Sequence, residues 1–226
     1  MYRFMRVGVV HFKAFPGVES GTGPILETLE KICADDFWTA VEVGWMKDYR
    51  VRNTARQLLD QSHLSVAYAT QPKMLTNKFN LNSFDQRERN AAIDAVKSCV
   101  DEARQLGAEV VRLIAGRDPG DEKREEAKKL LIDSLHQILE YAAQDGPMKF
   151  TLKIFDRSID KKNLIGHVED AVDVAKALRP HYPNFGLLTD LSHFPLLNED
   201  PEVSIPKMKD YLESVHLGNC AFRDKS

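Results

Sequence analysis

Two patterns of hydrophobic and polar residues alternate along the 226-residue chain. Short apolar runs, typical of buried parallel strands, are separated by longer segments in which apolar residues recur at helical spacing. The runs predict strands at Val7–Phe12, Thr39–Gly44, Leu64–Ala69, Glu109–Ala115, Lys149–Phe155, Phe185–Thr189 and Ser214–Leu217. Their starts lie about 34 residues apart on average, which is the size of a βα unit.

The segments between these runs predict amphipathic helices at Arg89–Leu106, Glu122–Ala143, His167–Leu178 and Ile205–Leu212. Gly107 stands where a left-handed cap would end the first helix, and Pro180 closes the third. The first half of the second helix is rich in Lys and Glu, which indicates a solvated face.

Strand followed by helix, repeated without a linker, predicts one α/β domain over residues 1–226 with a parallel sheet. A doubly wound open sheet is the alternative, but the segment Lys13–Gly17 after the first strand is not a Gly-rich phosphate loop. A β/α barrel is therefore favoured. Because such barrels usually need about 250 residues, and only seven strands are found, we expect the eighth βα unit to be missing.

Composition limits the partners that the chain can have. Its 31 Lys and Arg residues against 34 Asp and Glu residues give a net charge of -3, without a basic stripe for nucleic acid or an anionic membrane. The three cysteines, Cys33, Cys99 and Cys220, show no paired spacing and fit a reducing compartment. Neither a signal core nor an apolar run long enough for a membrane span is found, so we expect a cytoplasmic protein.

Polar residues gather at the predicted C-terminal ends of the strands, where barrels carry their chemistry. In chain order they are His11, Glu42, Gln71, Arg117 with Asp118, Lys153 with Asp156, Asp190 with His193, and His216 with Asn219. Any one of them is more often a structural hydrogen-bonding residue than a catalyst, but together they predict one polar rim. Five of them are predicted to contact substrate: His11, Gln71, Arg117, Asp156 and Asn219.

The alternation of side chains along a strand predicts which of these groups point into the barrel. Phe150, Leu152 and Ile154 share the face that suits helix packing, so Lys153 and Thr151 point inward. By the same rule His216 points inward, while its neighbours Val215 and Leu217 face the helices. A buried lysine is rare without a partner, so Lys153 is either a paired structural cation or a functional amine.

Asp190 and His216 follow neighbouring strands, and a carboxylate with an imidazole can ligate a divalent cation that polarises a substrate carbonyl. The alternative is that Asp190 and His193 form hydrogen bonds within their own loop.

Several segments resemble the xylose isomerase-like TIM-barrel superfamily, and within it the sugar or sugar-phosphate isomerases and epimerases. They are Leu152–Arg157, Leu164–Val172, Phe185–His193 and Val215–Cys220, with weaker likeness at Gln71–Leu75 and Leu81–Arg89. The resemblance implies a divalent cation (Mn, Mg, Co or Zn), a sugar or sugar-phosphate substrate, and proton transfer through an ene-diolate. It places metal ligands at Asp190 and His216 and a substrate contact at His193.

Two departures from the family pattern bear on the mechanism. Lys153 stands where the family has a Glu that is both metal ligand and base, and the final Glu ligand has no counterpart before Ser226. Lys153, His193 and Glu42 are the expected catalytic residues, and a neutral Lys153 would be a base or would form a Schiff base with a carbonyl. The metal site is therefore expected to be compromised.

Two other functions remain open. One is a metal-dependent hydrolase like the abasic-site endonucleases, which share this superfamily but would need more zinc ligands and a basic DNA-facing surface. The other is a non-catalytic binding relic of the fold. Such a relic would need another chain, or a second copy in a homo-oligomer, to cover the strands left open by the missing unit.

Overall fold

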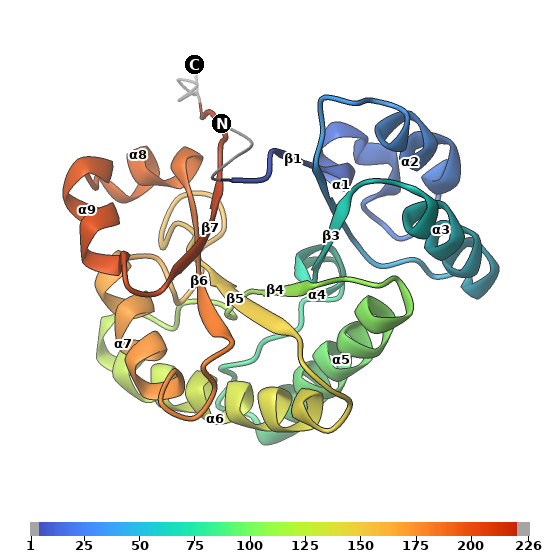
Figure 1. The fold of residues 1–226 in the computed structure, drawn as a ribbon. Coiled ribbons are helices and arrows are strands. Elements are labelled where there is room, and N and C mark those ends of the chain that lie inside the picture. Colours follow the sequence, from blue (N-terminus) through green and yellow to red (C-terminus); the bar gives the residue numbers. More distant parts are fainter. Residues whose placement is uncertain (1–4, 221–226) are drawn as a thin grey trace, which may run out of the picture.

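The computed structural model describes residues 5–220, and they form a curved sheet of parallel strands wrapped by helices (Figure 1). The strands are β1 (Gly8–Val10), β2 (Ala40–Val43), β3 (Ser65–Ala69), β4 (Val110–Leu113), β5 (Lys149–Lys153), β6 (Phe185–Asp190) and β7 (Leu212–His216). Each strand pairs in parallel with its predecessor, so the order across the sheet follows the sequence. This confirms the predicted barrel architecture, with seven strands and no eighth among the described residues.

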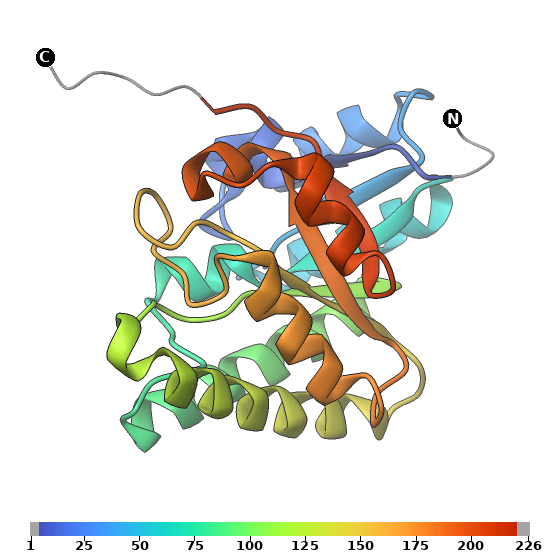
Figure 2. The same cartoon turned by 90° about the vertical axis from the view of Figure 1, so that its left-hand side faces the viewer.

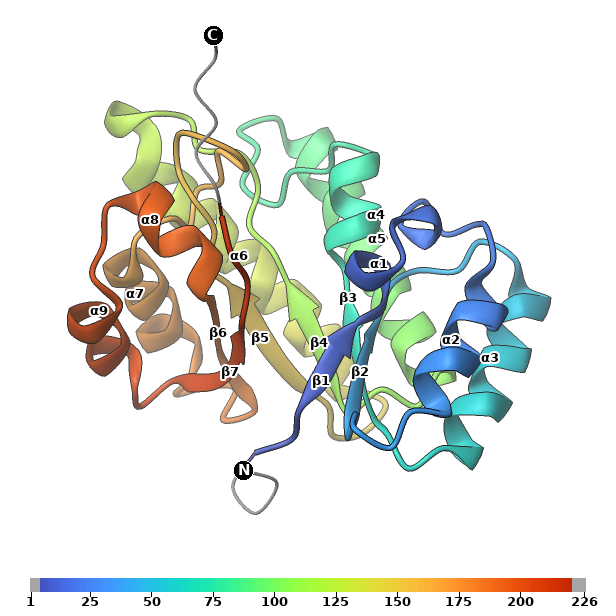
Figure 3. The same cartoon turned by 90° about the horizontal axis from the view of Figure 1, so that it is seen from above.

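The helices are α1 (His11–Ala14), α2 (Ile25–Cys33), α3 (Tyr49–Gln61), α4 (Gln71–Thr76), α5 (Gln86–Gln105), α6 (Arg124–Ala143), α7 (Val168–Leu178), α8 (Phe194–Leu197) and α9 (Pro201–Met208). The longer helices lie outside the curved sheet, whereas the short helices α1, α4 and α8 follow the ends of β1, β3 and β6. Short 3₁₀ turns occur at η1 (Pro16–Val18), η2 (Asp121–Lys123) and η3 (Leu191–His193). Seen from above, α2 and α3 lie on one side of the sheet and α7 and α9 on the other (Figure 3).

The two edge strands of this half-barrel are β1 and β7. In a closed barrel each would pair with an eighth strand, which would also remove both edges. That a second copy of the chain covers these edges stays a prediction.

The connections after β3, β4 and β5 gather on the same side of the molecule (left in Figure 2). Parallel strands place all their carboxyl ends at one end of the sheet, so loops far apart in sequence meet there. The polar residues predicted at the strand ends are therefore carried on one face.

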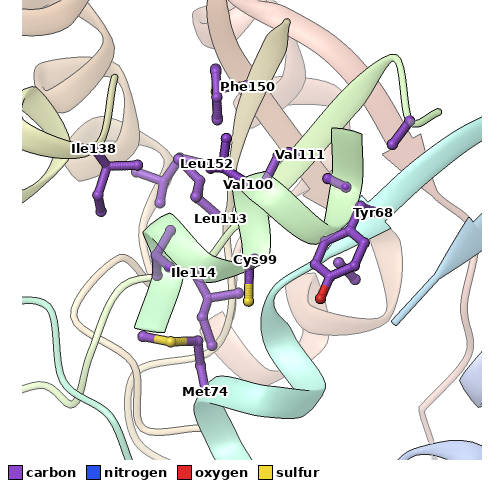
Figure 4. Close-up of a cluster of buried hydrophobic side chains, with 14 of the residues drawn as sticks. Tyr68, Met74, Cys99, Val100, Val111, Leu113, Ile114, Ile138, Phe150 and Leu152 are labelled. Atoms are coloured by element: carbon purple, nitrogen blue, oxygen red, sulfur yellow. The ribbon is translucent and has the colours of Figure 1, made fainter. Parts of the chain in front are cut away.

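The hydrophobic core lies between the sheet and the helices (Figure 4). Val111 and Leu113 of β4 and Phe150 and Leu152 of β5 point outward into it, and all four are almost completely buried. Burying side chains of this size stabilises the fold by about 1.5–3 kcal/mol each. The outward pointing of Phe150 and Leu152 agrees with the predicted alternation in β5.

All seven predicted strands and three of the four predicted helices occur close to their expected bounds. The first strand is shorter than predicted, because His11 and Phe12 already belong to α1. The prediction of a helix at Ile205–Leu212 was wrong in its placement: α9 starts at Pro201 and ends at Met208. Leu212 instead opens β7, where it pairs with Leu187 of β6.

The prediction that Val215 and Leu217 face helices was also wrong. Their exposed fractions are 44% and 84%, so both side chains face solvent. The inward direction predicted for His216 holds, since its ring contacts groups inside the half-barrel.

Helix α5 begins at an N-cap that the structure identifies as Asp85. Its carboxylate accepts hydrogen bonds from the backbone N–H groups of Arg87 (2.7 Å) and Glu88 (3.2 Å). At the other end Gly107 has a φ of 72°, which confirms the predicted left-handed cap.

Asp85→Ala is expected to lower the free energy of unfolding by about 1 kcal/mol, because two N–H groups of the first turn lose their acceptor. Urea denaturation measures the change. Asp94→Ala, at an exposed position within the same helix, is the matched control and should not destabilise. An equal loss in both variants would refute the capping role.

Within residues 5–220, no helix is both long and apolar enough to cross a bilayer.

Candidate active site

Four charged or titratable side chains from four strands meet inside the half-barrel. Glu42 comes from β2, Lys153 from the end of β5, Asp190 from the end of β6 and His216 from the end of β7. The strand register sets Asp190 beside His216, and Glu42 lies across the interior from them. Lys153 and His216 point inward as the alternation predicted, and His216 contacts Glu42, which lies 174 positions away in the sequence.

The Lys153 ammonium lies at the centre of this group. Its Nζ is 2.9 Å from Asp190 Oδ2 and 3.2 Å from His216 Nδ1, and it lies 4.8 Å from the centre of the Phe155 ring. The residue is only 7% exposed. Two of its three N–H donors are thus directed at protein acceptors, which agrees with the paired cation of the two sequence interpretations.

His216 connects the ammonium to Glu42. Its Nε2 donates to Glu42 Oε2 at 2.9 Å, while its Nδ1 accepts from Lys153. This arrangement requires the tautomer that carries its proton on Nε2. Asp190 completes the group. Its Oδ2 faces Lys153, and its Oδ1 accepts hydrogen bonds from the Ser192 hydroxyl (2.6 Å) and the Ser192 N–H (3.1 Å).

Arg112 of β4 belongs to the same cluster and was not among the predicted site residues. Its Nη1 donates to Ser214 Oγ (2.6 Å) and Thr151 Oγ1 (3.1 Å), and its Nε lies 3.4 Å from Glu42 Oε2 without hydrogen-bond geometry. Alternation along β4 could have found it, because Val111 and Leu113 on either side point outward. We define the Lys153 cluster as Glu42, Arg112, Lys153, Asp190 and His216.

Both carboxylates of the Lys153 cluster are ionised near neutral pH. Burial alone would raise the pKa of Glu42, but the nearby His216, Arg112 and Lys153 lower it to about 2. Burial likewise opposes ionisation of Asp190, whereas Lys153 and the Ser192 hydroxyl bring its pKa to about 2. Groups with such low pKa values are weak bases, so a catalytic role for Glu42 stays a prediction.

His193 lies beside the cluster. Its ring stands edge-on to Phe155, with Nε2 3.9 Å from Asp190 Oδ2. Burial lowers its pKa below the ordinary 6.5, mainly by penalising the charged ring. Its Nδ1 lies 3.4 Å from Asp156 Oδ1 without hydrogen-bond geometry, and this carboxylate favours the tautomer with the proton on Nδ1. Nε2 is then left with its lone pair on the side of the cluster.

Asp156, a predicted substrate contact, organises its own loop. It is completely buried, and its two oxygens accept the backbone N–H groups of Ile159, Asp160 and Lys161 at 2.7–2.9 Å. Burial would raise its pKa, but these three N–H groups lower it. Asp156 therefore holds the turn after β5, with its Oδ1 3.4 Å from His193 Nδ1.

Within the described residues, no hydrogen bond or ion pair joins the remaining predicted substrate contacts to the cluster. Arg117 and Asn219 are exposed, and Gln71 is buried at the start of α4. The Asp118 carboxylate binds Arg124 (2.8 Å) instead of facing the site.

His11 is buried away from the cluster, where its Nε2 bonds to the Thr28 hydroxyl of α2 at 2.7 Å. That hydroxyl also lies within hydrogen-bond distance of the Pro24 carbonyl (2.8 Å). Burial lowers the pKa of His11 to about 4. The group thus ties α1 to α2, a pairing that sequence alone could not predict.

The burial of His11 predicts an acid-sensitive fold. Between pH 6.5 and about 4, His11 is protonated in the unfolded chain but stays neutral in the folded chain. The free energy of unfolding therefore decreases as pH falls through this range, by up to about 3 kcal/mol. His11→Gln should flatten this part of a stability–pH curve from urea denaturation, whereas His181→Gln, at an exposed position, should not. An unchanged slope in His11→Gln would contradict the assignment.

Comparison with known proteins agrees with the fold. The sequence profile described as "Xylose isomerase-like TIM barrel" matches residues 34–225. The chain belongs to this family. No curated protein matches the sequence.

Solved structures of the same architecture include enzymes of two kinds. D-psicose 3-epimerase from Clostridium cellulolyticum H10, with D-tagatose, has a TM-score of 0.73 at 16% identity, over 96% of this chain and 74% of that one. The IOLI protein with a bound zinc atom has a TM-score of 0.72 at 16% identity, over 94% of this chain and 72% of that one. An AP endonuclease, family 2, from Brucella melitensis has a TM-score of 0.72 at 18% identity, over 95% of this chain and 80% of that one. At these identities the likeness shows the fold alone.

The metal ion that the family resemblance implies does not fit the residues present. Asp190 Oδ2 and His216 Nδ1 are 3.9 Å apart. A metal bound to both at about 2.1 Å would lie within about 3 Å of Lys153 Nζ. Repulsion between a dication and an ammonium at that distance is about 10 kcal/mol at an effective dielectric constant of 20. No three His, Cys, Asp or Glu side chains within residues 5–220 are otherwise grouped to hold a metal.

Proposed function

We propose that this chain is an isomerase- or epimerase-like enzyme that moves a proton beside the carbonyl group of a sugar or sugar phosphate. The observation that carries the proposal is the Lys153 ammonium, held inside the half-barrel at the strand ends beside His193. A fixed positive charge next to a neutral imidazole supplies the electrostatic stabilisation and the base that proton abstraction beside a carbonyl can use.

In the proposed reaction the remaining N–H of Lys153 binds the substrate carbonyl oxygen. His193 Nε2 takes the proton from the adjacent carbon, the electron pair of that C–H bond forms the carbon–carbon double bond, and the carbonyl π electrons move to the oxygen. Lys153 stabilises the resulting ene-diolate oxyanion through its charge. Return of the proton by His193 to the neighbouring carbon, with transfer of the hydroxyl proton to the former carbonyl oxygen, gives isomerisation. For epimerisation, solvent water on the opposite face would give a proton to the original carbon, and His193 would release the abstracted proton to solvent.

The cluster is in contact with solvent, which the proposal needs. The side chains of His216 and Arg112 are 16% and 13% exposed, although they line the interior. Arg112 adds a second fixed positive charge for substrate oxygens.

Exchange of substrate C–H groups with solvent tests the proposal. Ketoses such as D-tagatose, D-fructose and D-ribulose, with their phosphates, would be incubated with the protein in D₂O and EDTA, and deuterium uptake next to the carbonyl followed by proton NMR. We expect uptake by at least one sugar, lowered at least about 100-fold in His193→Gln. The exposed variant His181→Gln should keep full exchange. Exchange that His193→Gln leaves intact, or no exchange with any sugar of the panel, would overturn the proposal.

The abasic-site endonuclease alternative would need a cluster of zinc ligands, and residues 5–220 hold no group of three or more His, Cys, Asp or Glu side chains that could bind a metal.

A further inference from the structure

The Lys153 ammonium occupies the place at which the cluster's ligand atoms converge. Asp190 Oδ2 and His216 Nδ1 approach Nζ from two sides, and Glu42 supports the imidazole from behind through Nε2. A carboxylate and an imidazole supported by a second carboxylate are what metal centres commonly provide. Here the cation that these groups hold is the side chain of the protein itself.

We infer that Lys153 is a built-in cation that replaces a divalent metal ion, and that Lys153→Glu creates a divalent-cation site at this position. The inference concerns cation binding and does not depend on the proposed reaction. The wild-type chain then binds no divalent ion at Asp190 and His216, because the ammonium and the ion compete for the same two atoms.

Charge balance supports the assignment. The buried carboxylates Glu42 and Asp190 carry two negative charges, and Arg112 and Lys153 carry two positive charges, so the cluster is neutral without any ion. A dication added to this group would leave it with uncompensated positive charge in a mostly buried setting, which is unfavourable.

Replacing Lys153 by Glu reverses this balance. The substitution removes one positive charge and adds one carboxylate, leaving three carboxylates and one imidazole around Arg112. Two carboxylates and an imidazole that converge on one point are a ligand set suited to Mn²⁺, Co²⁺ or Zn²⁺.

The experiment compares Mn²⁺ binding by four full-length chains with electron paramagnetic resonance, after circular dichroism has checked folding. Wild type and K149E should bind no stoichiometric Mn²⁺ at about 1 mM, whereas K153E should bind one ion at least about 100-fold more tightly. Lys149 is the matched control, because it lies on the same strand but is exposed beside Glu213. D190N introduced into K153E should abolish the gain.

A wild-type measurement keeps the test independent of how the variants fold. The imidazole signals of His216 in a proton–nitrogen NMR spectrum should stay sharp when paramagnetic Mn²⁺ is added to wild type. Stoichiometric Mn²⁺ binding by wild type that broadens His216 would overturn the inference. So would a folded K153E chain that binds Mn²⁺ no more tightly than K149E.

Discussion

Arg112→Met is expected to lower the free energy of unfolding by about 3–5 kcal/mol, because it leaves the buried Glu42 carboxylate short of a positive partner. The guanidinium also holds β7 to the rest of the sheet through its bond to Ser214, and it reaches β5 through Thr151. Since β7 is an edge strand, we expect its amide protons to exchange faster than those of β6 in the variant. Urea denaturation and hydrogen exchange measure the two effects.

A double substitution separates lost charge pairing from lost packing. Glu42→Gln in the Arg112→Met background removes the uncompensated carboxylate, so part of the lost stability should return. Arg117→Met, at an exposed arginine beyond the same strand, is the control and should stay within about 0.5 kcal/mol of wild type. A loss below about 1 kcal/mol in Arg112→Met would show that the guanidinium does not hold the half-barrel together.

The sequence predicted the strands well because buried parallel strands are continuous apolar runs, and alternation within them then assigned each side chain a face. This is why Lys153 and His216 were correctly directed inward. The same rule applied to Val110–Leu113 would have placed Arg112 inside as well, since an arginine between two buried apolar residues has no other face to occupy.

Sequence reasoning missed α2 and α3, and only α3 has a weak local pattern. Helix α3 is polar over most of its surface, with only Ala55 and Leu59 fully buried, so its apolar stripe is narrow. Its clearest local signal is the Asp48 N-cap. Helix α2 buries Ile25, Leu29 and Ile32 at helical spacing, a signal that the sequence does carry.

The boundary between α9 and β7 depends on tertiary structure. Ile205, Met208 and Leu212 recur at helical spacing, which predicted a helix through Leu212. In the fold, the backbone at Tyr211 accepts a hydrogen bond from Leu187 N–H of β6 at 2.7 Å, and the chain pairs as a strand from Leu212 onward. Strand pairing with a distant neighbour is information that a local window does not contain.

The sequence likewise could not predict which side chain pairs with Lys153. Alternation showed that the lysine points inward, but a paired cation and a functional amine predict the same pattern of residues. Only the distance of 2.9 Å to Asp190 decides between an ammonium already held by the protein and a free amine.

Lys153→Met is expected to destabilise the fold by about 3–5 kcal/mol at neutral pH, because Asp190 then stays buried without its counter-charge. The loss should be smaller at about pH 4. In wild type the pKa of Asp190 is about 2, below its ordinary 3.8, so the stability that this carboxylate contributes is present above pH 3.8 and is lost as pH falls toward 2. In the variant, burial raises the pKa of the same carboxyl, so the folded chain gains stability as pH falls and the carboxyl becomes protonated.

The difference in the free energy of unfolding between wild type and Lys153→Met therefore becomes smaller as pH falls. A packing defect would leave this difference unchanged, so the pH dependence distinguishes a lost charge pair from a packing defect. Urea denaturation of both chains at the two pH values measures it, with Lys149→Met as the control for an exposed lysine of the same strand. A gap of equal size at both pH values would mean that the buried lysine stem stabilises the barrel and that its charge does not. A narrowing gap would show that the fold depends on the ammonium itself, which is the property expected of a side chain that stands in for a metal ion.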